Sequence, residues 1–311
     1  MPAYSQTESV LNLMQAPQSP THSQQSRSFF ARSMHHLWHD RLTMLGIGIL
    51  LTLTLACFLG PVVVENVLGL DVNRTNVLNA YAPLGAEGHL LGTDQAGRDH
   101  FLRLLYGGRI SLAIAYVASA LSITVGLALG LIAGYYGGLV DDLIIWVITT
   151  LNSIPAIFLL IVLSTIWSPS PEVLVFLLAF FGWIGTCRLI RGEVLTLKQR
   201  EYVVATRALG ARDWQIMVRH IFPNLLSVVI TALSVSAGSL ILAETGLSFL
   251  GLGVQPPDPT WGNMLSDART YFKRGVHLVT LPGLLITVTV FAFYVVGDGV
   301  RDAFDPRTRG S

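Results

Sequence analysis

The polar residues that could do chemistry are few and widely separated in this sequence. His35, His36 and His39 cluster beside Trp38, but no carboxylate or cysteine stands at ligand spacing from them. Because a metal ion needs three or four convergent ligands, we expect no metal site here. Glu244 ends a long apolar run, so it either reaches the membrane interface or serves as part of a gate or transport pathway.

Two further polar groups interrupt or flank apolar runs. Asn152 and Pro155 lie in the middle of one run, where the proline is expected to bend the helix and both residues are candidates for a gate or pathway. Asp94, Arg98 and Asp99 precede an amphipathic segment. Their spacing fits a local ion pair, but it favours a solvated capping arrangement for the following helix.

Motifs of the common catalytic classes are absent from the sequence. It contains no G-x-x-x-x-G-K-[ST] loop, no G-x-S-x-G elbow and no H-E-x-x-H pair. Cys57 and Cys187 stand alone in apolar runs, so neither a disulfide framework nor a metal site is expected. We therefore expect a chain that is not an enzyme, binds no cofactor and takes energy for any transport from outside itself.

The elements that must position these residues are membrane helices. The 311 residues are 52% hydrophobic and only 13% charged, with a mean hydropathy of +0.57, and the net charge of +1 gives no reason to expect a nucleic-acid partner. Apolar runs long enough to cross a bilayer predict an all-α membrane protein with six transmembrane helices. The predicted spans cover residues 42–64, 110–136, 143–168, 173–195, 224–246 and 277–298.

The remaining segments connect these spans or flank them. They are predicted as a disordered tail over residues 1–28, an interfacial helix over 29–41, loops over 65–109, 196–223 and 247–276, and a tail over 299–311. If the N-terminus is inside, 13 of the 20 Lys and Arg residues fall on the inner side. This positive-inside bias predicts cytoplasmic termini and a cytoplasmic 196–223 loop.

Three glycines recur at four-residue spacing in the second span. Gly126, Gly130 and Gly134 would leave one helix face almost bare, which lets another helix approach closely. Glycine is also common in membrane helices without such a role, but three in register favour a packing face.

The polar stretch over residues 201–224 reads as a pair of helices separated by Gly210. Its second helix places Trp214, Met217, Val218 and Ile221 at i, i+3, i+4 and i+7, which predicts one apolar stripe. An amphipathic hairpin of this kind lies on a membrane surface or against a partner.

This stretch resembles the EAA loop of binding-protein-dependent ABC importer permeases. The matching residues are Val204-Ala205-Thr206, then Gly210 and Pro223, with Val204 where the family pattern has glutamate. Residues 89–112, 247–265 and 297–307 also look like the second permease subunit of dipeptide, oligopeptide and nickel importers. The four motifs stand in the family's order, and the resemblance runs from about residue 30 to 308.

The resemblance implies a type I importer fold, with a permease domain over about residues 108–302, in the bacterial cytoplasmic (inner) membrane. It implies a homologous second permease, two ABC ATPases that bind ATP–Mg, and an extracytoplasmic binding protein as partners. The loop would then dock on an ATPase, and alternating access would follow. An acidic residue at Met217, or Gly210→Asp, would be expected to abolish ATPase association. The residues carried over for coupling are Glu201, Val204, Ala205, Thr206, Arg207, Gly210, Ala211, Arg212, Trp214, Met217 and Pro223.

Several functions remain open at this level. Relatives with these motifs carry dipeptides, longer peptides, nickel complexes or glutathione. A self-sufficient ion-coupled transporter or channel belongs to a different class, but the scarcity of charge inside the spans argues against it. A membrane-bound enzyme or scaffold would need a catalytic constellation that the sequence lacks.

Overall fold

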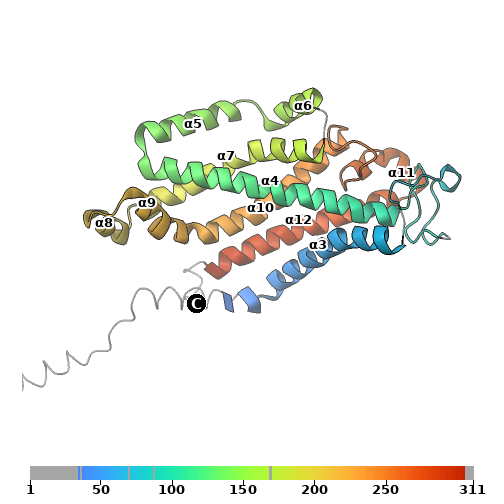
Figure 1. Cartoon of the computed structure of the whole chain (residues 1–311), viewed down its shortest axis with the longest axis horizontal. Coiled ribbons are helices and arrows are strands. Elements are labelled where there is room, and N and C mark those ends of the chain that lie inside the picture. Colours follow the sequence, from blue (N-terminus) through green and yellow to red (C-terminus); the bar gives the residue numbers. More distant parts are fainter. Residues whose placement is uncertain (1–33, 36, 69–70, 87, 168–169, 305–311) are drawn as a thin grey trace, which may run out of the picture.

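Long apolar helices lying side by side form the body of the protein (Figure 1). The structure is a computed structural model that describes residues 34–35, 37–68, 71–86, 88–167 and 170–304. Within these residues, five helices are long and apolar enough to cross a membrane, which confirms the predicted all-α membrane fold. They are α3 (Arg41–Leu68), α4 (His100–Tyr136), α7 (Pro171–Leu197), α10 (Phe222–Phe249) and α12 (His277–Phe304).

The sixth apolar segment is broken into two helices. The single run predicted over residues 143–168 forms α5 (Gly138–Asn152) and α6 (Ala156–Ile166), which meet at an angle of 76°. Pro155 lies in the break, where it removes a backbone donor. Helix α5 also begins before Asp141, because both carboxylate oxygens of Asp141 accept hydrogen bonds from Arg191 at 2.5 and 2.6 Å. Counting the pair as one span gives up to six spans.

Helix α4 begins ten residues before the predicted span over 110–136. The Asp99 side chain caps its first turn by accepting a hydrogen bond from the Leu102 amide at 3.0 Å. Arg103, inside the helix, is buried and paired with Asp94, so its charge does not end the helix. The amphipathic segment before residue 110 and the apolar span therefore form one continuous helix.

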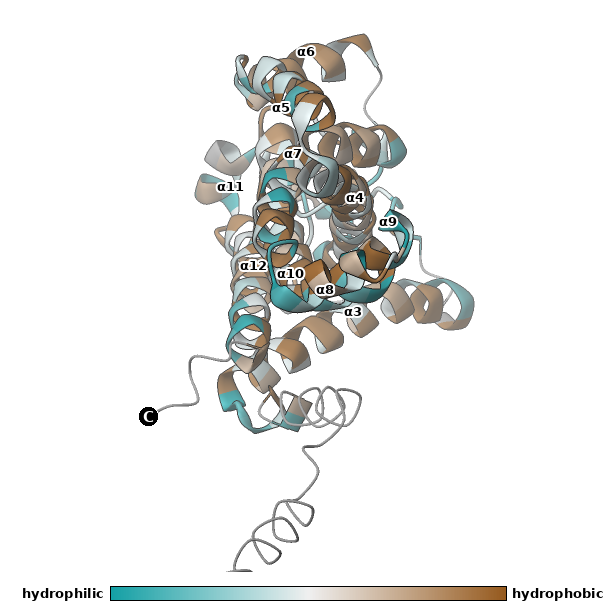
Figure 2. Cartoon of the chain, turned by 90° about the vertical axis from the view of Figure 1, so that its left-hand side faces the viewer, coloured by the Kyte–Doolittle hydropathy of each residue, from teal (hydrophilic) through white to brown (hydrophobic). Residues whose placement is uncertain are grey.

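Short elements occupy the two ends of the bundle (Figure 1). One end carries α8 (Glu201–Ala208), α9 (Asp213–Ile216) and a π-helical turn, η2 (Met217–Ile221), which together form the α8–α9 hairpin. The opposite end, termed the loop end, carries η1 (Val77–Asn79), η3 (Asn263–Leu265) and α11 (Ala268–Arg274). Figure 2 shows hydrophilic residues gathered on the α8–α9 hairpin, with apolar helices behind it.

Two predictions at the N-terminus fall largely outside the described residues. The disordered tail over residues 1–28 lies wholly outside them. Of the interfacial helix predicted over 29–41, residues 34–35 and 37–39 are helical. His36 is also outside the described residues, and elsewhere in the described chain no group of three His, Cys, Asp or Glu side chains could hold a metal ion.

The three spaced glycines lie against α7. A Cβ atom added at Gly126 would come within 2.6 Å of Thr186, and one added at Gly134 within 2.7 Å of Val194. At Gly130 it would lie 2.7 Å from the Cys187 carbonyl oxygen and 2.9 Å from the Ile190 Cβ. The stripe therefore allows α4 and α7 to pack with their backbones in close approach.

Gly130→Ala should lower the stability of the folded protein by about 1–3 kcal/mol, because the added methyl group meets a backbone carbonyl that cannot rotate away. The thermal unfolding midpoint of the detergent-solubilised protein measures this effect. Gly192→Ala on α7 is a matched control, since its Cβ would meet no atom within 4 Å. Equal midpoints for the two variants would contradict the close packing of α4 on α7.

Candidate functional site

The turn of the α8–α9 hairpin is formed by Gly210. Its φ of +83° places it in the left-handed region, which side chains disfavour. The Gly210 amide donates to the Arg207 carbonyl at 3.0 Å, and the Ala211 amide donates to the Thr206 carbonyl at 3.3 Å. These two bonds form a Schellman motif, which ends α8 and directs the chain into α9.

One side of the hairpin is built into the transmembrane core. Val203, Ile216, Met217 and Ile221 are buried, and they pack in one cluster with side chains of α4, α7 and α10. The cluster members from those helices are Tyr135, Ile190, Val194 and Leu225. The hairpin is therefore fixed to the spans through an apolar contact of its own.

The other side of the hairpin exposes apolar surface. Leu209 is 89% exposed, Trp214 69% and Val204 55%. The predicted stripe over Trp214, Met217, Val218 and Ile221 is thus wrong as a single face, because Met217 and Ile221 point into the protein and Trp214 points out. An acidic residue at Met217 would disturb this chain's own core rather than a docking surface.

The remaining residues predicted for coupling lie mostly on the surface of the hairpin. Glu201, Ala205, Arg207, Gly210, Arg212 and Pro223 are exposed, and Thr206 and Ala211 are partly buried. The contact with the Tyr135 hydroxyl raises the pKa of Arg207, so its guanidinium stays charged. The hairpin thus presents apolar side chains among positive charges.

The second limb of the hairpin continues directly into α10 through the π-helical turn. Pro223 stands in the first turn of α10, directly after the wide turn of η2. Within this turn the Phe222 amide donates to the Met217 carbonyl. The Asn224 side-chain amide donates to the His220 carbonyl at 2.6 Å. Proline has no backbone donor to give, and the wide turn just before it lets the helix continue without a break.

A groove of about 820 Å³ runs between α7, α10 and α12. Glu193 and Arg301 lie in its lining near the hairpin end of their helices, and Gly185 opens it because nothing lies within 4 Å of its Cβ position. The hydroxyl side chains that line it are Thr186, Ser227, Thr231, Ser236 and Ser239. Such a lining can hold water or a polar solute along the spans.

The predicted gate and pathway residues do not line this groove. Asn152 and Pro155 lie at the break between α5 and α6, and Glu244 is fully buried in α10. The sequence analysis did not identify the groove, although Ser227, Thr231 and Ser239 are spaced at multiples of four residues and therefore share one face of their helix. That spacing was the available signal.

Two arginines of α7 have partners on α5. Arg191 binds Asp141 through two hydrogen bonds, and the side-chain oxygen of Asn152, turned toward Arg188, accepts from both of its terminal nitrogens at 3.1 Å. Arg188 itself is exposed. Asn152 thus attaches the end of α5 to α7.

Glu244 lies in a buried network rather than at an interface as predicted. Its exposure is 0%, and its carboxylate accepts from the Ser248 hydroxyl at 2.7 Å and the Ser111 hydroxyl at 3.4 Å. The Ser111 oxygen accepts from the Trp261 backbone amide at 3.1 Å. The indole of Trp261 donates to the Leu104 carbonyl at 2.9 Å. Glu244 therefore joins α4, α10 and the loop before η3.

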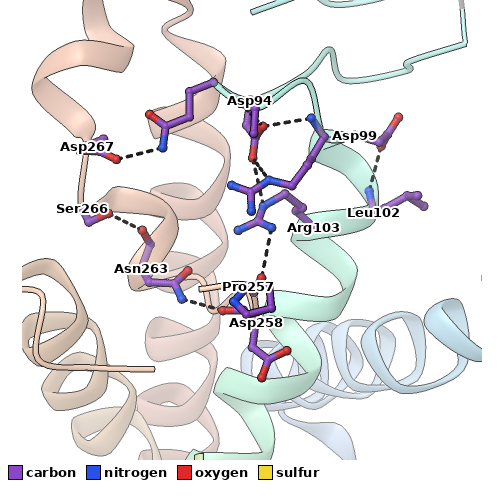
Figure 3. A network of polar contacts seen from close by, with 12 residues as sticks. Asp94, Asp99, Leu102, Arg103, Pro257, Asp258, Asn263, Ser266 and Asp267 are labelled. Carbon is purple, nitrogen blue, oxygen red and sulfur yellow. Dashed lines mark hydrogen bonds and ion pairs between the residues drawn. The ribbon is translucent and has the colours of Figure 1, made fainter. Parts of the chain in front are cut away.

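A buried ion-pair network stands at the loop end of the bundle (Figure 3). The Asp94 carboxylate accepts from the Arg98 Nε at 2.7 Å and lies 3.4 Å from the Arg103 Nε. Arg103 also donates to the Pro257 carbonyl at 3.5 Å. The prediction of a solvated cap is right for the capping role of Asp99 and wrong for Asp94, which is buried.

This network borders a small pocket of about 110 Å³. Tyr271 of α11 lines the pocket, and burial raises the pKa of its phenol, which therefore stays neutral. The network ties α4, the loop before it and the loop around Pro257 into one rigid unit.

Known proteins are similar to the chain over most of its length. The dipeptide transport system permease protein DppC of Bacillus subtilis (strain 168) is 34% identical over 96% of this chain and 92% of its own. The oligopeptide transport system permease protein OppC of the same organism is 34% identical over 92% of both chains. The glutathione transport system permease protein GsiD of Pectobacterium atrosepticum is 39% identical over 85% of this chain and 86% of its own.

A protein-family model of transport permeases matches more than half of the chain. Residues 126–310 match the binding-protein-dependent transport system inner membrane component, a region that includes the groove, the hairpin and Glu244. The apolar spans and the identity with permeases agree with this match. The chain therefore belongs to the family of inner membrane components of binding-protein-dependent transport systems, as a multi-pass permease subunit of the inner membrane.

Proposed function

We propose that this chain is one of two homologous permeases in an ATP-driven importer of di- or oligopeptides. The observation that carries the proposal is the two-sided hairpin. Its inner side is packed into α4, α7 and α10, while its outer side exposes Leu209, Trp214 and Val204 among arginines. A cytoplasmic ATPase that docks on the outer side would move the spans when it binds and hydrolyses ATP.

The partner subunits supply what this chain lacks. The sequence has no phosphate-binding loop, so in this proposal ATP–Mg binds to two ABC ATPases and not to this chain. An extracytoplasmic binding protein delivers the cargo at the loop end, and this chain binds no cofactor of its own. The positive-inside bias of the sequence supports cytoplasmic termini and a cytoplasmic hairpin.

The groove between α7, α10 and α12 is proposed as this subunit's half of the translocation path. Its volume of about 820 Å³ is within the usual range of ligand sites, about 300–1,000 Å³. Hydroxyl groups can both donate to and accept from the amides of a peptide main chain, whatever its side chains. A path of this kind would pass many sequences, and the binding protein would do most of the selection.

Peptides are favoured over a nickel complex as cargo. The names of the dipeptide and oligopeptide permeases support peptides, and the glutathione permease is named for a small peptide too. Imidazole is the side-chain ligand that suits nickel. Within the described residues, no His or Cys side chain lines the groove.

Reconstitution in liposomes tests the proposal. The chain with its partner permease, both ATPases and the binding protein should import labelled di- or oligopeptides when the ATPase side has ATP. The chain alone should import none under a proton or sodium gradient. Gradient-driven import by the chain alone would instead identify a secondary transporter.

A further inference from the structure

Tyr135, the second-last residue of α4, touches both limbs of the α8–α9 hairpin. Its hydroxyl donates to the Asp213 carboxylate of α9 at 2.6 Å. The guanidinium carbon of Arg207, in α8, lies 5.1 Å from the centre of the Tyr135 ring, within cation–π range. One side chain of a transmembrane helix therefore binds the two short helices that the Gly210 turn separates.

The Tyr135 ring is buried among apolar side chains of the spans and the hairpin. Tyr135 is only 5% exposed, and its ring packs in the cluster with Ile190 and Val194 of α7 and Val203 of α8. Asp213 and Arg207 are exposed on the hairpin. A rigid ring with two charged partners fixes the hairpin in one orientation relative to α4.

Helix α4 does not adjoin the hairpin in sequence, because α5, α6 and α7 lie between them. The hairpin is joined in sequence to α7 at one side and to α10, through the π-helical turn, at the other. Across the described residues, no other side chain of α4 hydrogen-bonds to the hairpin. The end of α4 is also held by its packing on α7 and by the Lys198 Nζ, which donates to the Gly134 carbonyl at 2.7 Å just before the hairpin begins. Tyr135 is thus the α4 side chain that bonds the hairpin itself.

Helix α4 also spans the whole height of the molecule. Its 37 residues make it about 55 Å long, well beyond a hydrocarbon core of about 30 Å. Its far end holds Arg103 in the ion-pair network with Asp94, next to the loop around Pro257. A displacement of its hairpin end is therefore carried to the loop end by a single rigid element.

We propose that Tyr135 is a positioning residue that makes α4 move together with the hairpin, so that movement of a docked ATPase reaches the loop end of the permease. This inference rests on the proposed function. Loss of the Tyr135–Asp213 bond would leave the ATPase docked and active while α4 follows its movement incompletely. The expected result is partial uncoupling, in which the importer hydrolyses ATP but imports less peptide for each ATP.

The test uses the complete reconstituted importer and measures peptide imported per ATP hydrolysed. Tyr135→Phe keeps the ring and removes the hydroxyl, so the ratio should fall several-fold while the ATPases still co-purify. Tyr136→Phe is the matched control, because Tyr136 is the next residue, is 53% exposed and makes no hydrogen bond in the described part of the chain. It should keep the wild-type ratio.

Variants of the acceptor separate this role from folding. Asp213→Leu, at an exposed position, should lower the ratio as Tyr135→Phe does, and Asp213→Asn, which keeps an acceptor oxygen, should lower it less. The double variant Tyr135→Phe with Asp213→Leu should match either single one, since both remove the same bond.

Three results would overturn the inference. They are a wild-type ratio in Tyr135→Phe, additive losses in the double variant, and loss of ATPase association in either single variant. Failure of the proposed function is a different result, because the wild-type complex itself would then neither assemble nor import peptide.

Discussion

Trp214→Glu should prevent the ATPases from co-purifying and should abolish ATP-driven uptake. Trp214 is 69% exposed, so it contributes little to the chain's own core and much to any surface that covers the hairpin. Replacing a buried aromatic anchor at an interface commonly costs about 2–4 kcal/mol, or roughly a 30- to 1,000-fold loss of affinity. Pull-down of the ATPases with the tagged permease measures the loss.

Two further variants control this experiment. Trp214→Phe keeps an aromatic surface and should retain most of the association. Met217→Glu should instead lower the yield and thermal midpoint of the permease itself, because Met217 is buried in this chain. Intact association in both Trp214→Glu and Leu209→Glu would show that the exposed side of the hairpin is not the docking surface.

Asp94→Ala should destabilise the permease by about 3–5 kcal/mol, because it leaves Arg103 buried without its carboxylate partner. It also removes the acceptor of the Ala96 and Arg98 backbone amides. The thermal unfolding midpoint in detergent should fall accordingly. We expect the loops at the loop end to become sensitive to protease at the same time.

Asp258→Ala is the matched control for this substitution. Asp258 lies next to the same network (Figure 3), but unlike Asp94 it is exposed to solvent. Its removal should change the stability by no more than about 0.5 kcal/mol. A midpoint for Asp94→Ala as high as that of Asp258→Ala would mean that the network does not hold the loop end together.

The spans were predictable because the bilayer imposes a length and a composition on them. Helix ends were less predictable, since hydropathy marks where the chain is apolar and not where the helix stops. The predicted spans exclude Arg103 and Asp141, yet each lies inside a helix because an ion pair neutralises its charge. The partners, Asp94 and Arg191, are on other elements and carry no signal in a local window.

The site was predictable where a local pattern determines the geometry and not where distant residues do. Gly210 had to form a turn, and the spaced glycines of α4 needed only one neighbouring helix. Glu244 depends on Ser111, which is 133 positions away, so its burial could not be inferred from its place at the end of an apolar run. The groove required three helices to be placed before its hydroxyls could be seen together.

The π-helical turn η2, between α9 and α10, changes the direction in which the side chains before it point relative to those after it. Each residue of an α-helix advances by about 100°, so a turn with one extra residue rotates everything before it by about that angle relative to everything after. A regular helix would hide Trp214 on the face that buries Ile221. The rotation points these two side chains in different directions. One continuous helical run therefore packs Ile221 into the transmembrane core and exposes Trp214 to a partner protein. Deleting one residue within this turn would remove the rotation and turn Trp214 inward, without any change in the types of residues that the hairpin presents.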